Sequence, residues 1–383
     1  MKILFYDMGS YTYKDFNYYL RKMGHTCKTL YYRFPDRFRD DFFVERFSQY
    51  LKKDNYDAVI SVNFFPLVSK LCHEYQIPYV AWCYDSPLSS DLTPYFPYET
   101  NYILLFDRIE VEQYQSEGYT RVFHLPLAVN TDRLDALTFT KNQIDTYSAD
   151  ISFVGQLYQS TLETLTYFTD DYTKGYIEAL IQAQLRIYGY YMLDELVTDE
   201  ILDAVNNSIK GTGQNGLTLN HRGLSCAIAT KITQLERSFL LESMGELFDT
   251  RFYAAEEVSI PHVKLCGPVK YPDEMPGVFR YSKLNLNPTL KCIQSGIPLR
   301  ALDIMGAGGV LFSNYQPELA EEFEDGRDVI LYSSMEEAVA KADFYLQQDD
   351  LRRQIGENGY RKVKEAYNYP KRITEMFELL RNN

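Results

Sequence analysis

Apolar residues in the first part of the chain follow two alternating periods. Residues 2–6 form a short apolar run that ends in a polar loop, whereas Phe16, Tyr19, Leu20 and Met23 recur at the spacing of one helical face. Further apolar runs at 29–32, 57–62, 79–84, 102–106 and 121–129 predict strands, with helix-like stretches between most of them. Strands that alternate with helices form βαβ units, which build a parallel sheet covered by helices on both faces. Residues 1–135 are therefore predicted to form a Rossmann-like domain.

A second domain is predicted from residue 136 to residue 383. The polar stretch 130–149 has no strong period and is interpreted as a linker, and a new apolar strand at 150–155 follows it. The pattern from about 160 to 261 is mainly helical; strand–helix alternation then resumes and ends in two helices, the last of which can return to the first domain. The predicted fold class is α/β, with two Rossmann-like domains facing a central cleft and a helical insertion in the second domain.

Composition narrows the possible functions. The 383 residues carry 39 Lys and Arg against 53 Asp and Glu, which argues against a protein that coats nucleic acid, because phosphate binding needs clustered cations. The six cysteines are scattered without a CxxC pair, as is usual for free thiols in a reducing compartment. No apolar run reaches the length of a membrane span, and the first residues turn polar too early for a signal peptide. We therefore expect a cytoplasmic protein without a transmembrane segment.

Candidate site residues come from the ends of the predicted strands, because open parallel sheets bind ligands beyond the carboxyl ends of their strands. In the first domain this rule selects Gly9, Ser10, Tyr11, Asn63 and Asp85. In the second domain it selects Gly155, Gln156, Tyr158, Asn287 and the loop that continues to residue 300.

The segment 285–309 holds the strongest candidate site. A predicted strand runs through a loop into a helix whose first turn contains Ser295, Gly296 and Ile297, and free amides at a helix N-terminus favour phosphate binding. Arg300 can grip two phosphate oxygens, and Asp303, one turn further on, can accept both hydroxyls of a ribose. The alternative is structural: Ser295 caps the helix, and Arg300 pairs with Asp303 on its surface.

Two other motifs have weaker functional interpretations. Adjacent Asp170 and Asp171 are similar to a metal-binding acidic motif, but no third acidic residue is close by, so we interpret them as solvated surface and expect no metal site. The loop GTGQNG at 211–216 does not follow a strand and lacks the GK[ST] ending of a phosphate-binding loop, so we interpret it as a turn.

The segment 285–309 resembles the nucleotide-sugar site of GT-B glycosyltransferases, in particular the spore-maturation-protein-B-like (CgeB-like) branch of glycosyltransferase group 1. The matching residues there are NLN at 285–287, RALD at 300–303 and GAGG at 306–309. Upstream, the same branch is matched by WCYDSP at 82–87, LFD at 105–107, HLPLA at 124–128 and SFVGQLY at 152–158. The resemblance spans nearly the whole chain and is weakest over the helical insertion.

This resemblance implies a glycosyltransferase that needs neither metal nor cofactor. It would move a sugar from a nucleotide-diphosphate sugar, with UDP as the expected nucleotide, to a hydroxyl of a glycan, a protein or a small molecule. Donor binding would fall to the second domain and acceptor binding to the first. In related enzymes two glutamates eight positions apart contact the donor sugar and the ribose; here Ser295 and Asp303 stand at those positions. Because Ser295 cannot supply a carboxylate, the donor sugar and the choice between retention and inversion stay open.

The transfer would also need groups that stabilise the leaving diphosphate and accept a proton. Positive charge and amide dipoles on the diphosphate are expected from Arg300, Lys291, Gly296 and Ile297, above a floor of Gly155, Gln156 and Tyr158. An inverting transfer needs a general base, for which Asp85 and His124 are the candidates. Each has a structural alternative: Asp85 as part of an Asx turn, and His124 as a hydrogen-bonded core side chain.

Two further functions are compatible with the sequence. A nucleotide-sugar epimerase uses a similar scaffold, but it needs more acid and base groups than the candidate residues supply. A non-catalytic nucleotide-sugar-binding partner protein is the other alternative, because Ser295 stands where a carboxylate is expected.

Overall fold

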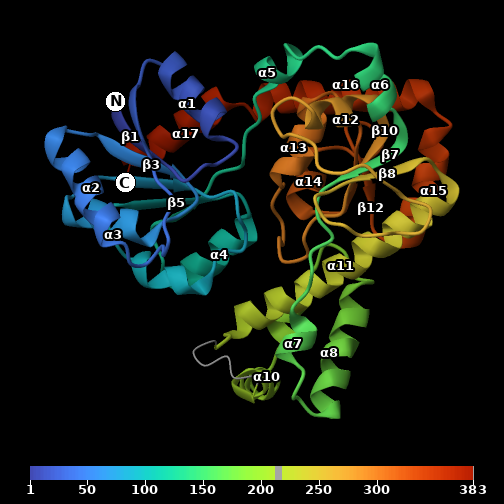
Figure 1. Cartoon of the computed structure of the whole chain (residues 1–383), viewed down its shortest axis with the longest axis horizontal. Coiled ribbons are helices and arrows are strands. Elements are labelled where there is room, and N and C mark those ends of the chain that lie inside the picture. Colours follow the sequence, from blue (N-terminus) through green and yellow to red (C-terminus); the bar gives the residue numbers. More distant parts are fainter. Residues whose placement is uncertain (212–217, 383) are drawn as a thin grey trace. The chain divides into compact units, whose positions relative to one another are not determined.

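The computed structural model describes residues 1–211 and 218–382, so all but the first residue of the glycine-rich loop at 211–216 lies outside the described residues. The chain divides into two compact units. The first comprises Met1–Thr131, Gly296–Leu302 and Val363–Asn383, and the second comprises Asp132–Ser295 and Asp303–Lys362. Each unit is built around a parallel six-stranded sheet with helices packed against it (Figure 1).

The sheet of the first unit has the strand order β2-β1-β3-β4-β5-β6. Its strands are β1 (Lys2–Asp7), β2 (Thr26–Tyr31), β3 (Ala58–Val62), β4 (Tyr79–Trp82), β5 (Asn101–Leu105) and β6 (Val122–His124). The helices between them are α1 (Tyr13–Lys22), α2 (Asp41–Lys53), α3 (Pro66–Glu74) and α4 (Arg108–Ser116), with a 3-10 turn at Ser90–Tyr95. The predicted alternation of strands and helices is thus confirmed for this unit.

Both faces of the first sheet are buried, as is typical of a parallel sheet. Neighbouring side chains of β1 show this, because Phe5 packs edge-on against Phe16 of α1 and Tyr6 packs edge-on against Phe43 of α2. The last helix, α17 (Tyr369–Asn382), belongs to the same unit and lies beside α1 (Figure 1). Tyr369 of α17 stacks on Tyr19 of α1 with ring centroids 5.5 Å apart.

The sheet of the second unit has the strand order β12-β11-β10-β7-β8-β9. Its strands are β7 (Ala149–Val154), β8 (Thr250–Tyr253), β9 (Lys264–Leu265), β10 (Ser282–Asn287), β11 (Leu311–Asn314) and β12 (Ile330–Tyr332). The helices that follow β9 are α12 (Met275–Tyr281), α13 (Leu299–Gly306), α14 (Pro317–Glu322), α15 (Met335–Leu346) and α16 (Asp349–Ala366). The predicted two-sheet α/β class is therefore confirmed.

Helices occupy most of the predicted insertion. They are α7 (Leu162–Leu165), α8 (Asp171–Gln184), α9 (Leu193–Leu196), α10 (Asp199–Gly211) and the long α11 (His221–Leu247), which runs from this group toward the second sheet (Figure 1). The expectation that the helical region extends to residue 261 is wrong, because β8 pairs with β7 inside it. The predicted linker likewise contains two short helices, α5 (Thr131–Asp135) and α6 (Lys141–Tyr147). Across 1–211 and 218–382, no helix is long and apolar enough to span a membrane.

Candidate functional site

Each sheet has one place where the strand order reverses. In the first sheet β2 and β3 lie on opposite sides of β1, and in the second sheet β8 and β10 lie on opposite sides of β7. A crevice at such a reversal, beyond the carboxyl ends of the strands, is the usual ligand site of an open parallel sheet. The predicted residues Gly9 and Asn63 follow β1 and β3, and Gly155 and Asn287 follow or end β7 and β10. The sequence therefore placed candidate residues at both reversals.

The loop after β1 is held by the last residue of that strand. The Asp7 Oδ1 atom accepts hydrogen bonds from the backbone N–H of Gly9 at 2.8 Å and of Ser10 at 3.0 Å. Gly9 has φ of 101°, and a Cβ atom there would lie 2.8 Å from Nη2 of Arg33. The loop is tightly fixed and leaves Tyr11 exposed over 80% of its surface.

Asn63 and Asp85, predicted separately from the ends of two strands, contact each other. The Asn63 Nδ2 atom donates a hydrogen bond of 2.6 Å to Oδ2 of Asp85. Burial by the surrounding protein raises the pKa of the Asp85 carboxyl, although part of the side chain is exposed, and the hydrogen bond from Asn63 opposes that rise. Asp85 is thus a carboxylate with a perturbed pKa at the carboxyl end of the sheet, as a candidate general base requires.

A buried glutamate holds the segment that follows Asp85. Glu110 accepts hydrogen bonds from Oγ of Ser86 at 2.6 Å and from the backbone N–H of Leu88 at 2.7 Å. Asp107 caps α4, the helix that also carries Glu110, by accepting from the N–H of Ile109. Glu110, in the first turn of α4, therefore fixes the residues that follow Asp85.

His124, the alternative candidate base, ends β6. Its Nε2 atom lies 3.3 Å from the backbone oxygen of Phe106, and the residue is half-buried. The ring therefore makes the backbone hydrogen bond that the structural interpretation expected.

In the second unit, Arg237 of α11 joins the two loops at the strand reversal. Its Nε and Nη2 atoms donate to the backbone oxygen of Pro288, after β10, at 3.1 and 2.6 Å. Its Nη1 atom donates to the backbone oxygen of Gln156, after β7. The guanidinium also lies 4.7 Å from the ring centre of Tyr158, a residue with φ of 64°. Burial lowers the pKa of Arg237, and the neighbouring Tyr158 and Glu236 oppose part of that shift.

Gly155 is confined by the strand that it follows. A Cβ atom at Gly155 would lie 3.0 Å from the ring of Phe153, so the backbone here fits closely over that ring. With Gln156 and Tyr158 it forms the loop that Arg237 holds. The three residues predicted for the donor floor are therefore brought together.

Lys291 is an internal cation. Its Nζ atom lies 3.4 Å from Oε2 of Glu236 and 3.8 Å from the ring centre of Tyr188. Lys291 is 9% exposed and Glu236 is fully buried. The Tyr188 hydroxyl donates to Glu236 at 2.7 Å, and burial followed by the charge of Glu236 raises the pKa of this tyrosine. The sequence predicted Lys291 as a diphosphate contact and did not anticipate this ion pair.

The region around Ser295 corrects one expectation. Helix α13 begins at Leu299, so Ser295, Gly296 and Ile297 precede it instead of forming its first turn. The physical reason is Pro298, because the residue before a proline is disfavoured in the helical region. Because α13 begins four residues after Ser295, this residue is not the N-cap of the helix. Its hydroxyl donates a hydrogen bond of 2.7 Å to Oε1 of Glu318.

The remaining residues predicted for the donor site differ in their hydrogen-bond partners and in the unit to which they belong. Asn287 is buried, and its amide donates to Thr289 at 3.3 Å and to Ser313 at 3.1 Å. Asp303 accepts a hydrogen bond of 3.0 Å from the Tyr271 hydroxyl. Gly296, Ile297 and Arg300 belong to the first unit and Asp303 to the second, so α13 is divided between the units.

Hollows in the second unit occur at both ends of its sheet. A small recess beside Lys291 is lined by Gln184 and Tyr190 of the insertion and by Asn314 after β11. A larger cavity of about 700 Å³ opens at the opposite end, near the starts of β10 and β11. Of the predicted donor residues, Lys291 lines the smaller hollow, and none lines the larger one. Asp170, interpreted above as solvated surface, caps α8 by accepting from the N–H of Thr173.

The sequence patterns did not predict several polar residues that contact these sites. They are Glu110, Glu236, Arg237, Tyr271 and Glu318, each hydrogen-bonded or ion-paired to a predicted residue or to its loop. One signal was available, because Glu236 lies four residues from both Ile232 and Leu240 on the apolar face of α11.

Part of the chain matches a known protein family, and the whole chain resembles solved structures in its fold. Residues 237–378 match the model of a family described as glycosyl transferase-like. Among curated proteins no sequence matches this chain. A glycosyltransferase from Rickettsia africae is 12% identical over 99% of this chain and 97% of its own, with a TM-score of 0.55.

Two other solved structures are similar over their whole length. Sucrose-phosphate synthase from Thermosynechococcus elongatus is 11% identical over 100% of this chain and 98% of its own, with a TM-score of 0.57. Anabaena HepE, solved with UDP and glucose, is 11% identical over 100% of both chains, with a TM-score of 0.53. The chain therefore has the GT-B fold of glycosyltransferases, and its residues 237–378 are similar to the glycosyl transferase-like family.

Proposed function

We propose that this protein is a glycosyltransferase that uses a nucleotide-diphosphate sugar, in the spore-maturation-protein-B-like branch of group 1. The observation that supports this most directly is the position of Arg237. It is the first residue of the region that matches the glycosyl transferase-like family, and it joins the loops after β7 and β10 at the strand reversal. A donor site at that reversal agrees with the general rule for open parallel sheets.

The donor that we propose is a UDP-hexose. HepE, a structural neighbour, has been solved with UDP and glucose and with UDP-glucose. In this chain Asp303, hydrogen-bonded by Tyr271, is a buried carboxylate suited to two ribose hydroxyls. Arg300, Gly296 and Ile297 stay candidates for the diphosphate. The proposed acceptor is a hydroxyl of a glycan, a protein or a small molecule, and the proposed transfer requires no metal.

The proposed reaction is a displacement at the anomeric carbon. The acceptor oxygen forms a bond to that carbon, and the bond from the carbon to the diphosphate oxygen breaks with its electron pair on the leaving UDP. In an inverting transfer the acceptor proton passes to Asp85, whose perturbed pKa suits a base.

Thermal stability with UDP, GDP, ADP and dTDP and their sugars tests the donor site. A ligand at about 100 times its dissociation constant stabilises a protein by about 2.7 kcal/mol, so UDP and UDP-glucose should raise Tm selectively. Asp303→Asn should weaken the preference for UDP over deoxy-UDP, whereas Asp150→Asn, in an exposed pair with Lys283, is the matched control. Absence of a Tm increase with any of these ligands would contradict the proposal.

Turnover tests the activity itself. UDP release from UDP-glucose, first with water and then with candidate acceptors, should depend on Asp303. Conversion of the donor sugar without UDP release would indicate an epimerase, and binding without any conversion would indicate a non-catalytic partner protein.

A further inference from the structure

Asn63 occupies an unusual backbone position at the carboxyl end of β3. Its φ of 67° lies in the left-handed region, which asparagine tolerates better than most residues other than glycine. Its N–H donates to the backbone oxygen of Trp82 at 2.9 Å, and its own backbone oxygen accepts from Oγ of Ser61 at 2.6 Å. The peptide groups on both sides of Asn63 are therefore fixed by hydrogen bonds.

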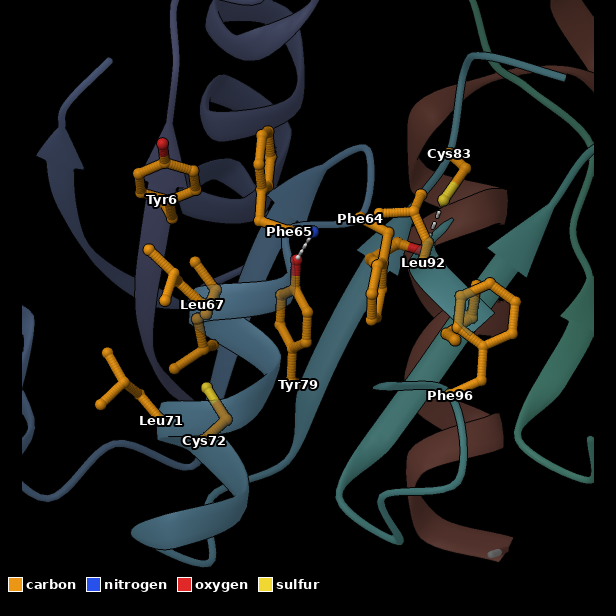
Figure 2. Close-up of a cluster of buried hydrophobic side chains, with 14 of the residues drawn as sticks. Tyr6, Phe64, Phe65, Leu67, Leu71, Cys72, Tyr79, Cys83, Leu92 and Phe96 are labelled. Atoms are coloured by element: carbon orange, nitrogen blue, oxygen red, sulfur yellow. Dashed lines mark hydrogen bonds between the residues drawn. The ribbon is translucent and has the colours of Figure 1, made fainter. Parts of the chain in front are cut away.

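The turn that carries Asn63 is anchored to the core beneath it. The Tyr79 hydroxyl is fully buried, lies 2.7 Å from Oγ of Ser61 and accepts from the N–H of Phe65 at 3.0 Å. Figure 2 shows Tyr79 reaching Phe65 within a cluster of apolar side chains that also contains Phe64. Asn63 is thus held at the end of a rigid chain of contacts that begins in the core.

The side chain of Asn63 is directed at one dipeptide. Its Oδ1 atom accepts from the backbone N–H of Tyr84 at 2.7 Å and of Asp85 at 3.3 Å. Its Nδ2 atom donates to Oδ2 of Asp85 at 2.6 Å. The amide therefore fixes both the backbone of Asp85 and the direction of its carboxylate.

The groups around this carboxylate include no cation paired with it in the described part of the chain. Asn63 donates from the β3 side, and Glu110 of α4 holds the residues that follow Asp85. Burial raises the pKa of the neighbouring Cys83 thiol, and the charges of Glu110 and Asp85 raise it further. The hydrogen bond from Asn63 favours the ionised form of Asp85 and so opposes the larger effect of burial, which raises the pKa of this carboxyl.

We propose that Asn63 is a positioning residue that keeps the Asp85 carboxylate oriented and ionised, ready to take the proton of the acceptor hydroxyl. This inference rests on the proposed function for the role of Asp85. The reaction it serves is an inverting transfer, in which the proton moves to Oδ1 or Oδ2 of Asp85 as the acceptor oxygen bonds to the anomeric carbon and UDP leaves. A retaining transfer would not need this base.

Titration of the Asp85 carboxyl tests the part of the proposal that does not depend on activity. Carbon-13 NMR of protein labelled at aspartate carboxyls gives the pKa, and the signal missing from Asp85→Asn assigns it. Asn63→Gly removes the amide yet tolerates the left-handed φ, so it should raise the pKa of Asp85 by about one unit, as loss of a hydrogen bond to a charged group predicts. Asn63→Asp, which adds a like charge, should raise it at least as much.

A second residue with positive φ supplies the matched control. Gln76, after α3, has φ of 53° and donates from Nε2 to the backbone oxygen of His73 at 2.7 Å. Gln76→Gly also removes an amide from the left-handed region of the same unit, and it should leave the pKa of Asp85 unchanged. An Asp85 pKa that is equal in wild type and Asn63→Gly overturns the proposal.

The pH profile of kcat/KM then tests the catalytic consequence. Activity requires ionised Asp85, so it falls as pH decreases through the pKa of this group, and Asn63→Gly should move that acid limb to higher pH by about one unit. UDP binding should be unchanged in the variant. A loss of activity that is equal at every pH overturns the role in ionisation. Absence of transfer by the wild type, with a shifted Asp85 pKa in the variant, would instead contradict the proposed function.

Discussion

Replacing Arg237 by methionine should destabilise the second unit, because it removes the donors that join two loops. The guanidinium donates twice to the backbone oxygen of Pro288 and once to that of Gln156. Arg237 is 7% exposed, so the Pro288 oxygen would lose its donors in a buried place. Methionine fills a similar volume, which keeps the cavity small and isolates the effect of the lost hydrogen bonds.

The expected cost follows from the number of acceptors left without a donor. A buried acceptor that loses its partner costs about 1–3 kcal/mol, and one acceptor in each of two loops is affected, so the loss should be about 2–6 kcal/mol. Folded domains are stable by only about 5–15 kcal/mol, so the variant should unfold at clearly lower denaturant concentration. Arg237→Lys should recover part of the loss, since its ammonium keeps the charge but not the planar fork.

Urea unfolding followed by two probes measures this loss. Trp82, the single tryptophan, is buried in the first unit, so its fluorescence reports that unit, while far-UV circular dichroism reports both. Lys231→Met is the matched control on α11, because its exposed pair with Glu163 should contribute less than about 1 kcal/mol. A loss below about 1 kcal/mol for Arg237→Met would refute the reasoning.

Three further predictions concern buried charge, acidity and backbone strain. Lys291→Met should cost about 3–5 kcal/mol in urea unfolding, because it leaves the buried carboxylate of Glu236 without its cation; a loss below about 1 kcal/mol would count against the ion pair. Hydrogen bonds from its lysine partners lower the pKa of Asp54 from 3.8 to about 2, so its stabilising contribution is present above 3.8 and lost as pH falls through about 2. The difference in unfolding free energy between wild type and Asp54→Asn should therefore decrease to zero as pH falls from 3.8 to about 2. A difference that persists below that range would disprove the role of the Asp54 charge. Gly189→Ala should lower Tm, because Gly189 has φ of 77° and a Cβ would lie 2.7 Å from the ring of Tyr315; an unchanged Tm would show that the loop can shift at no cost.

The sequence predicted those elements whose signals are local. Helix α15 is an example, because the Ser334 side chain caps it by accepting from the N–H of Glu337, three residues further on. The Glu337 carboxylate accepts in turn from the N–H of Ser333. Strand β8 was missed because TRFY at 250–253 is too short and too mixed to form an apolar run. It becomes a strand by pairing with β9 and with β7, and the β7 pairing joins residues about a hundred positions apart.

The candidate-site residues differ in the same way: those with a local sequence signal were predicted, and those placed by contacts between distant segments were not. The ends of strands identified Asn63, Asp85 and Gly155, because a turn after an apolar run is visible in the sequence. No local pattern could show that Arg237, within a long helix, binds the backbone of Gln156 and Pro288. Its neighbour Glu236 was detectable only as a charge on an apolar helix face, which does not identify its partner.

The contribution of α17 to the first unit has a consequence for synthesis on the ribosome. Phe16 and Trp82 emerge early, but Tyr369, which contacts both rings, is made nearly three hundred residues after Trp82. At about 5–20 residues per second, the delay is roughly fifteen to sixty seconds. During that time the region around Phe16 and Trp82 lacks the part of its cover that α17 supplies, so the nascent chain offers a hydrophobic surface to chaperones until α17 is translated.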